Sequence, residues 1–226
     1  MMNLRRLTIA QLCRRLRMAH GPVETWEKLP PLDELIATIL AQNTSNANSD
    51  AAFARLKRRF STWEAVRQAK PRSIAAAIRV AGLSRLKAPR IKNILEHLHR
   101  QRCILSLDFL CKLPDDEALA YLRGLKGVGP KTAACVLLFA CGKPILPVNT
   151  QVHRVARRLG LIGPRTSAER AHELLAKIVP KELVIDFHVL LIRHGRTICL
   201  PRKPRCTECV LLDACPDGQR RLGINR

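Results

Sequence analysis

The sequence of 226 residues predicts an all-α protein, and two observations support this prediction. Aromatic residues make up only 4% of the chain, and no stretch alternates apolar and polar residues over several positions, so the signals of β-strands are nearly absent. Apolar residues instead recur at intervals of three and four, which is the period of an amphipathic helix. We therefore expect about ten short helices.

The apolar stripes follow one another along the chain, and most of them end at glycine or proline. Ser167 is placed to cap one of these helices, although Arg170 stands where a capping box has glutamate. The first helix is expected within the Arg-rich N-terminal 20 residues, and the later stripes are Leu35–Leu40, Ala52–Phe60, Ala75–Val80, Ile91–Leu98, Ala118–Leu125, Val136–Ala140, Val152–Leu159, Leu174–Ile178 and Glu182–His194. The clearest candidate boundary between two domains is Gly142-Lys143-Pro144.

The net charge indicates a polyanionic partner. Lys and Arg number 40 and Asp and Glu 18, which gives +22 and points to nucleic acid or an anionic membrane surface. With 47% hydrophobic residues, the chain is too apolar for a disordered basic tail. Its longest apolar run, Ala133–Cys141, has nine residues and falls far short of a membrane span.

Nine cysteines are divided between a scattered set and a cluster. The odd total, together with an N-terminus that lacks the apolar segment of a secretion signal, argues against a disulfide framework and favours a reducing, cytoplasmic setting. Four cysteines follow the spacing Cys199-x6-Cys206-x2-Cys209-x5-Cys215, which indicates a metal site. The uneven spacing favours a [4Fe–4S] cluster, and a structural zinc ion is the alternative. The scattered cysteines are Cys13, Cys103, Cys111, Cys135 and Cys141.

Two basic segments fit DNA phosphates. The loop between the first two clustered cysteines carries Arg202, Lys203 and Arg205. A second group, Arg154, Arg157 and Arg158, lies on the helix that begins near residue 150.

A glycine hairpin separates two of the expected helices. Gly127-Val128-Gly129 follows Lys126 and precedes Pro130, which suits the first turn of a helix. Two glycines allow unusual φ angles without side-chain bulk, Val128 is expected in the core, and the exposed amides can bind a phosphate. A plain connection between two helices is the alternative.

Lys131 lies in the first turn after the hairpin. The positive end of the helix dipole disfavours a protonated amine there, so Lys131 is a candidate nucleophile for a Schiff base. A further lysine in contact with phosphate is the alternative.

The hairpin, the lysine and the cysteine spacing together resemble the endonuclease III family of helix-hairpin-helix DNA glycosylases. The resemblance spans essentially the whole chain. It implies a six-helix barrel domain at residues 23–143 and a [4Fe–4S] domain built from residues 1–22 and 144–226, with the active site in the cleft between them. The implied activity is base-excision repair, as a glycosylase with abasic-site lyase activity on damaged pyrimidines. The implied substrate is double-stranded DNA with damaged bases or abasic sites, bound by a monomer in the cytoplasm or the prokaryotic nucleoid.

The same resemblance implies roles for single residues. Lys131 matches the family's nucleophile, and Cys199, Cys206, Cys209 and Cys215 match the cluster ligands. Gln42 matches the glutamine that fills the gap left by a flipped base, and Leu83 matches the leucine that wedges into the opposite strand. Without the resemblance, Gln42 reads as a satisfied polar residue at a helix end and Leu83 as a core leucine.

Asn149 departs from the family pattern. The chain reads Val148-Asn149-Thr150-Gln151 where the family has V-D-T-H, so an amide replaces the catalytic aspartate. An amide neither accepts the lysine proton nor stabilises a cationic sugar well, although it caps a helix as well as aspartate does. Asp186 is the nearest replacement carboxylate.

Three interpretations of Asn149 stay open. They are an engineered trap for DNA complexes, a natural glycosylase of low activity, and a lesion-binding protein without turnover. A sister branch that removes mismatched adenine has glutamate where this chain has Thr38.

Overall fold

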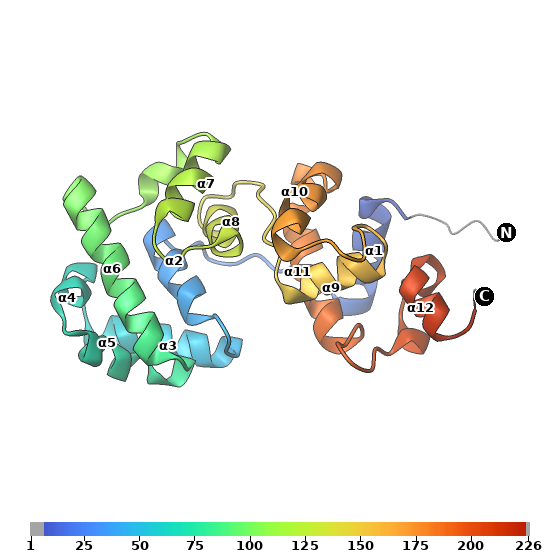
Figure 1. The fold of residues 1–226 in the computed structure, drawn as a ribbon, viewed down its shortest axis with the longest axis horizontal. Helices are drawn as coiled ribbons and strands as arrows, with labels where there is room; N and C mark the ends of the chain where they lie inside the picture. Colours follow the sequence, from blue (N-terminus) through green and yellow to red (C-terminus); the bar gives the residue numbers. More distant parts are fainter. Residues whose placement is uncertain (1–6, 225–226) are drawn as a thin grey trace. The chain divides into compact units, whose positions relative to one another are not determined.

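The computed structural model describes residues 7–224, and every regular element in that range is a helix (Figure 1). The range contains twelve α-helices and five short 3-10 helices. The prediction of an all-α fold is confirmed. The chain divides into two compact units, one formed by Lys28–Lys143 and the other by the segments that end at Glu27 and begin at Pro144. Residues 1–6 and 225–226 of the expected cluster domain lie outside the described residues.

The unit of residues 28–143 is built around α2 and α8, which pack against each other. Helix α8 is buried almost all round, from Thr132 to Leu138, whereas α2 buries the stripe that includes Leu35 and Ile39. The helices of this unit are α2 (Pro31–Leu40), α3 (Asn46–Arg59), α4 (Trp63–Gln68), α5 (Pro71–Ala77), η1 (Arg79–Ala81), α6 (Ser84–Arg102), η2 (Asp108–Cys111), α7 (Asp115–Gly124) and α8 (Pro130–Phe139).

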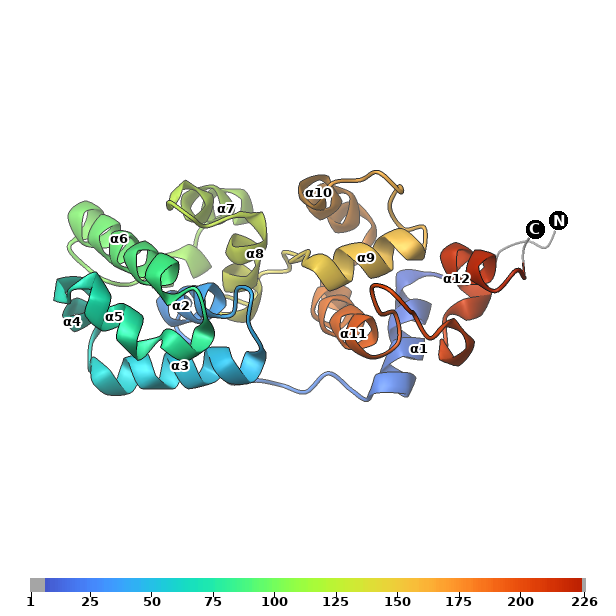
Figure 2. The same ribbon diagram turned by 60° about the horizontal axis from the view of Figure 1, so that its bottom comes forward.

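The second unit joins the two ends of the chain. Helices α1 and α11 lie side by side in both views, although more than 160 residues separate them (Figures 1 and 2). An ion pair between Arg17 and Asp186 links them, and Arg193 donates to the carbonyl oxygen of Pro22 at 2.7 Å. The helices are α1 (Ile9–His20), α9 (Thr150–Arg158), α10 (Ala168–Ile178), η3 (Lys181–Leu183), α11 (Val184–Thr197), η4 (Cys206–Glu208), η5 (Leu212–Ala214) and α12 (Pro216–Arg221).

Polar side chains cap several helices, as the local sequence predicts. Ser167 accepts from the backbone N–H of Arg170, so the predicted cap of α10 is confirmed. Helices α4 and α12 were not predicted, because six residues are too few to repeat an apolar stripe. No helix within residues 7–224 is both long and apolar enough to cross a bilayer.

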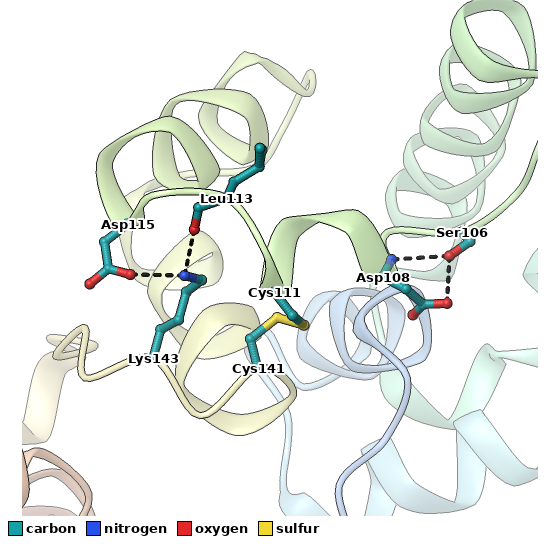
Figure 3. Close-up of a disulfide and its surroundings, with 7 residues drawn as sticks. All are labelled: Ser106, Asp108, Cys111, Leu113, Asp115, Cys141 and Lys143. Atoms are coloured by element: carbon teal, nitrogen blue, oxygen red, sulfur yellow. Dashed lines mark hydrogen bonds and ion pairs between the residues drawn. A yellow bond between two sulfur atoms is a disulfide. The ribbon is translucent and has the colours of Figure 1, made fainter.

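A disulfide joins Cys111 in η2 to Cys141, two residues after α8 ends (Figure 3). The sequence analysis argued against a disulfide framework, and this pair is a disulfide that it did not predict. Folding brings two residues 30 positions apart to a Cα–Cα distance of 4.9 Å, which lies within disulfide range. Nearby, Lys143 donates to the carbonyl oxygen of Leu113 and pairs with Asp115 at 2.9 Å.

Candidate functional site

The hairpin between α7 and α8 requires glycine at its first position. Gly127 has a φ of +88°, and a Cβ there would lie 2.6 Å from Nε of Arg90. Gly129 differs from the expectation, because its backbone is extended with φ of −90° and ψ of 176°. A Cβ on Gly129 would meet nothing within 4 Å, so the hairpin has open space at this point. Val128 is only 6% exposed, and its predicted place in the core is confirmed.

The N-terminus of α8 is suited to an anion. Gly129 is the N-cap and makes no side-chain capping hydrogen bond, and Pro130 follows at the first helical position. The amides of the first turn have no acceptor within the helix, so they can donate to a phosphate. Lys126 is exposed beside them.

Lys131 lies where the first turn of α8 meets α2. Its half-buried side chain interacts electrostatically with the carboxylate of Glu34 in α2 and with the buried thiol of Cys135. Burial raises the pKa of Glu34. Two effects partly offset this rise: the hydroxyl of Thr38 donates to Oε1 of Glu34 at 3.0 Å, and the positive charge of Lys131 favours the ionised carboxylate. The sequence analysis did not single out Glu34, because an acidic residue in the first turn of a helix ordinarily complements the macrodipole.

The side-chain amide of Gln42, two residues after α2 ends, is hydrogen-bonded at both its oxygen and its nitrogen. Its Oε1 accepts from Arg90 at 2.8 Å, and its Nε2 donates to the hydroxyl of Thr132 at 3.3 Å. These bonds tie the Gln42 loop to α8 and to the arginine that passes over Gly127. The adjacent residue Asn43, not predicted from the sequence, is exposed with a φ of +55°.

Leu83 is exposed on a second loop of the same unit. Its side chain is 51% accessible and its φ is +50°, so the alternative of a core leucine is wrong. The buried Lys87 joins this loop to the Gln42 loop, because its ammonium donates to the carbonyl oxygens of Leu40 at 2.8 Å and Ala81 at 2.9 Å.

Asn149 lies in the other unit and caps α9. Its Oδ1 accepts from the N–H of Val152 at 2.9 Å, which is the capping role predicted for the amide. Asp186, the expected replacement carboxylate, pairs with Arg17.

The four clustered cysteines line a single pocket in this unit. Two side chains point hydrogen-bonding groups at their sulfurs: Nη1 of Arg158 lies 3.3 Å from Sγ of Cys199, and Nε2 of His194 lies 3.5 Å from Sγ of Cys209. Within residues 7–224, no group of three or more His, Cys, Asp or Glu side chains is arranged to hold a single metal ion.

The loop between Cys199 and Cys206 presents its three cations to solvent. Arg202, Lys203 and Arg205 are all exposed. Arg154 and Arg158 were expected to contact phosphates, but in the structure their guanidinium groups donate to backbone carbonyls between Gly195 and Pro201. They therefore fix the backbone that leads into this loop.

Comparisons with known proteins agree with this arrangement. Residues 36–181 match the family described as HhH-GPD superfamily base excision DNA repair protein. Endonuclease III of Thermotoga maritima is 36% identical over 84% of this chain and 85% of its own length, and that of Escherichia coli is 35% identical over 82% and 83%. A candidate DNA glycosylase of Arabidopsis thaliana is 39% identical over 85% of this chain, which spans 66% of that protein.

The fold is also found among solved structures. The structure of a trapped covalent intermediate of endonuclease III with DNA superposes with a TM-score of 0.80 at 29% identity, over 96% of this chain and 99% of that chain. A non-covalent endonuclease III–DNA complex gives the same TM-score at 28% identity. The chain therefore belongs to the HhH-GPD superfamily of base excision DNA repair glycosylases, within its endonuclease III family.

Proposed function

We propose that this protein is a bifunctional DNA glycosylase that removes damaged pyrimidines from double-stranded DNA and cleaves the resulting abasic site as a lyase. The observation that carries the proposal is Lys131, held in the first turn of α8 directly behind the hairpin, where it interacts electrostatically with the half-buried carboxylate of Glu34. A neutral lysine amine attacks C1′ of the sugar, forms a Schiff base and permits β-elimination of the 3′ phosphate.

Two loops hold the duplex open in this proposal. Leu83 enters the stack opposite the lesion, and Gln42 occupies the gap that the flipped base leaves. The exposed, left-handed Leu83 supports its role. Gln42 exchanges its bonds to Arg90 and Thr132 for bonds to the unpaired base. The backbone amides around Gly127 and Gly129 bind a phosphate of the damaged strand. Val128 anchors this hairpin in the core, and Lys126 lies beside the amides.

The domains have separate tasks. Residues 23–143 form the barrel that carries these loops, and residues 1–22 with 144–226 form the cluster domain, a division supported by the two compact units. Four cysteine thiols in one pocket form the donor set of a [4Fe–4S] cluster, and Cys199, Cys206, Cys209 and Cys215 would hold it. When bound, the cluster would order the loop that presents Arg202, Lys203 and Arg205 to DNA phosphates.

The decisive experiment is borohydride trapping on an abasic duplex. The wild-type protein is expected to form a covalent adduct, and Lys131→Ala is expected to form none. Absence of an adduct with wild type, or an equal yield with Lys131→Ala, would refute the lyase activity. The cluster is tested separately: an absorption band in the visible region that bleaches on reduction supports it, whereas a colourless protein loaded with zinc refutes it.

A DNA-binding protein with little or no turnover is the second candidate, and Asn149 favours it. The amide keeps the α9 cap but supplies no proton acceptor. This candidate predicts tight binding to abasic DNA without strand cleavage. If wild type is not trapped, Asn149→Asp separates the two cases: an adduct means an intact site that lacks one group, and no adduct means a binding protein.

A further inference from the structure

The chemistry at Lys131 needs a proton acceptor that Asn149 does not provide. Three carboxylates that could be considered for this role are already paired with other groups. Asp186 pairs with Arg17, Asp115 pairs with Lys143, and Asp33 accepts from Lys57 at 3.0 Å and from the indole of Trp63 at 2.6 Å. Glu34 differs from these three, because its partner within hydrogen-bond distance is the neutral hydroxyl of Thr38.

We propose that Glu34 is the carboxylate that takes the proton from Lys131 in this protein. Helix α2 packs against α8, and Glu34 and Thr38 lie one turn apart on α2. Gln42 follows one turn after Thr38 and donates to Thr132 of α8, the residue next to Lys131, so this side of α2 is directed toward the first turn of α8. Glu34 and Lys131 interact there electrostatically. This inference rests on the proposed lyase function and names a second residue of the same site.

The surroundings of Glu34 suit a general base. The charged and titratable groups facing it from α8 are the ammonium of Lys131 and the buried thiol of Cys135, while on its own helix Thr38 donates to it and Asp33 is bound by Lys57 and Trp63. Burial raises the pKa of Glu34, which strengthens the carboxylate as a base. Lysine has a long, flexible stem, so its amine can turn between the carboxylate and the sugar.

The proton balance closes on an abasic site. The Glu34 carboxylate accepts one proton from the Lys131 ammonium, which leaves a neutral amine. The nitrogen lone pair forms a bond to the C1′ aldehyde carbon while the π electrons of the C=O bond move to its oxygen. One proton then passes from the nitrogen to that oxygen, which gives a neutral carbinolamine. The Glu34 carboxyl then returns the proton to the hydroxyl, which leaves as water while the C–N double bond of the Schiff base forms.

The test measures single-turnover trapping by cyanoborohydride on an abasic duplex, with protein in excess, between pH 5 and 9. Glu34→Gln is expected to slow trapping about 100-fold or more, within the range for loss of a general base. The wild-type rate is expected to rise with pH as Glu34 ionises, and Glu34→Gln is expected to lack this acidic limb. Glu34→Asp, which keeps a carboxylate, is expected to recover part of the rate and the limb.

Asp33→Asn is the matched control, because it removes the neighbouring carboxylate of the same helix. It is expected to trap within about twofold of wild type with an unchanged pH profile, since Lys57 and Trp63 hold the carboxylate of Asp33. Melting temperature and affinity for the abasic duplex are measured for every variant, so a folding defect is separated from a defect in proton transfer.

Each outcome decides one question. Trapping by Glu34→Gln at the wild-type rate, with the same pH profile, overturns the role of Glu34 and leaves the lyase intact. Faster trapping by Glu34→Gln also overturns it, because Glu34 would then hold Lys131 protonated. No adduct with wild type overturns the lyase function and the Glu34 role together.

Discussion

Replacement of Lys87 by methionine tests whether one buried amine fixes the two loops that carry Gln42 and Leu83, which we propose contact the DNA. Lys87 is 3% exposed, and its ammonium donates to the carbonyl oxygen of Leu40, at the end of α2, and to that of Ala81, at the end of η1. Carbonyls at helix ends lack partners within the helix, so Lys87 satisfies two groups that burial would leave unpaired. Gln42 and Leu83 each lie two residues beyond one of these carbonyls.

The magnitude follows from the two hydrogen bonds. Each buried carbonyl left unpaired costs about 1–3 kcal/mol. Burial and the charge of Arg90 lower the pKa of Lys87, which means that the ammonium itself is poorly solvated and that its removal returns part of this energy. We therefore expect Lys87→Met to lower the free energy of unfolding by about 2–4 kcal/mol. Methionine retains most of the aliphatic stem, so loss of packing contributes little.

Urea unfolding followed by circular dichroism measures the loss, and fluorescence of 2-aminopurine opposite an abasic site measures opening of the duplex. Lys92→Met is the matched control. Lys92 lies on the same helix and also donates to two carbonyls, those of Arg67 and Ala69, but these are at the end of α4 and hold neither loop. Both variants should unfold more easily, and only Lys87→Met should lose duplex opening. An unfolding free energy within about 0.5 kcal/mol of wild type for Lys87→Met, or an equal loss of opening in both variants, would refute this reasoning.

Three further predictions concern the hairpin, the α9 cap and the carboxylate of Glu34. Gly127→Ala should lower stability by about 1–2 kcal/mol and weaken abasic-DNA binding in a fluorescence-anisotropy titration, because of the φ of +88° and the clash with Arg90. Asn149→Ala should lower the unfolding free energy by about 1 kcal/mol through loss of the bond to Val152, whereas Asn149→Asp should not. Glu34→Gln should stabilise the protein at neutral pH. The folded pKa of Glu34 lies above its ordinary value of 4.5, so wild type loses stability as pH rises through that interval. Thermal melts should show an advantage of Glu34→Gln that grows from pH 4 to 7; an advantage that shrinks contradicts the sign.

Local sequence patterns predicted much of the fold because helices are set by spacing and caps within a few residues. The stripe Leu35–Leu40 and the cap Ser167 needed no knowledge of the tertiary structure. The disulfide between Cys111 and Cys141 depends on how η2 meets the end of α8, and spacing along the chain carries no signal for it. Gly129 resembles Gly127 in the sequence, yet only Gly127 adopts a conformation that excludes other residues.

The candidate site was predicted unevenly for the same reason. The hairpin and Lys131 are adjacent in the sequence, and the four cysteines lie within 17 residues, so local spacing was enough to predict them as site residues. Arg154 and Arg158 carry the same charge as surface arginines, and only their bonds to the loop after Gly195 show that they brace it. Glu34 lies 97 residues before Lys131, and only the packing of α2 against α8 brings their charges together.

If Asn149 caps α9 and Glu34 accepts the proton, substitutions at the two residues should depend on each other. In the family pattern, one aspartate both caps a helix and serves the chemistry. Here Asn149 performs the cap, and the carboxylate of Glu34 on α2 interacts electrostatically with the lysine. If Glu34 supplies the proton acceptor, Asn149→Asp in the wild-type chain adds a second acceptor to a site that already has one, and the trapping rate should change little. In the Glu34→Gln chain the same substitution supplies the missing group, and the rate should rise steeply. The two substitutions are therefore expected to be non-additive, because they act on one proton. A large gain from Asn149→Asp that is the same in both chains would mean that Glu34 has no part in activating Lys131.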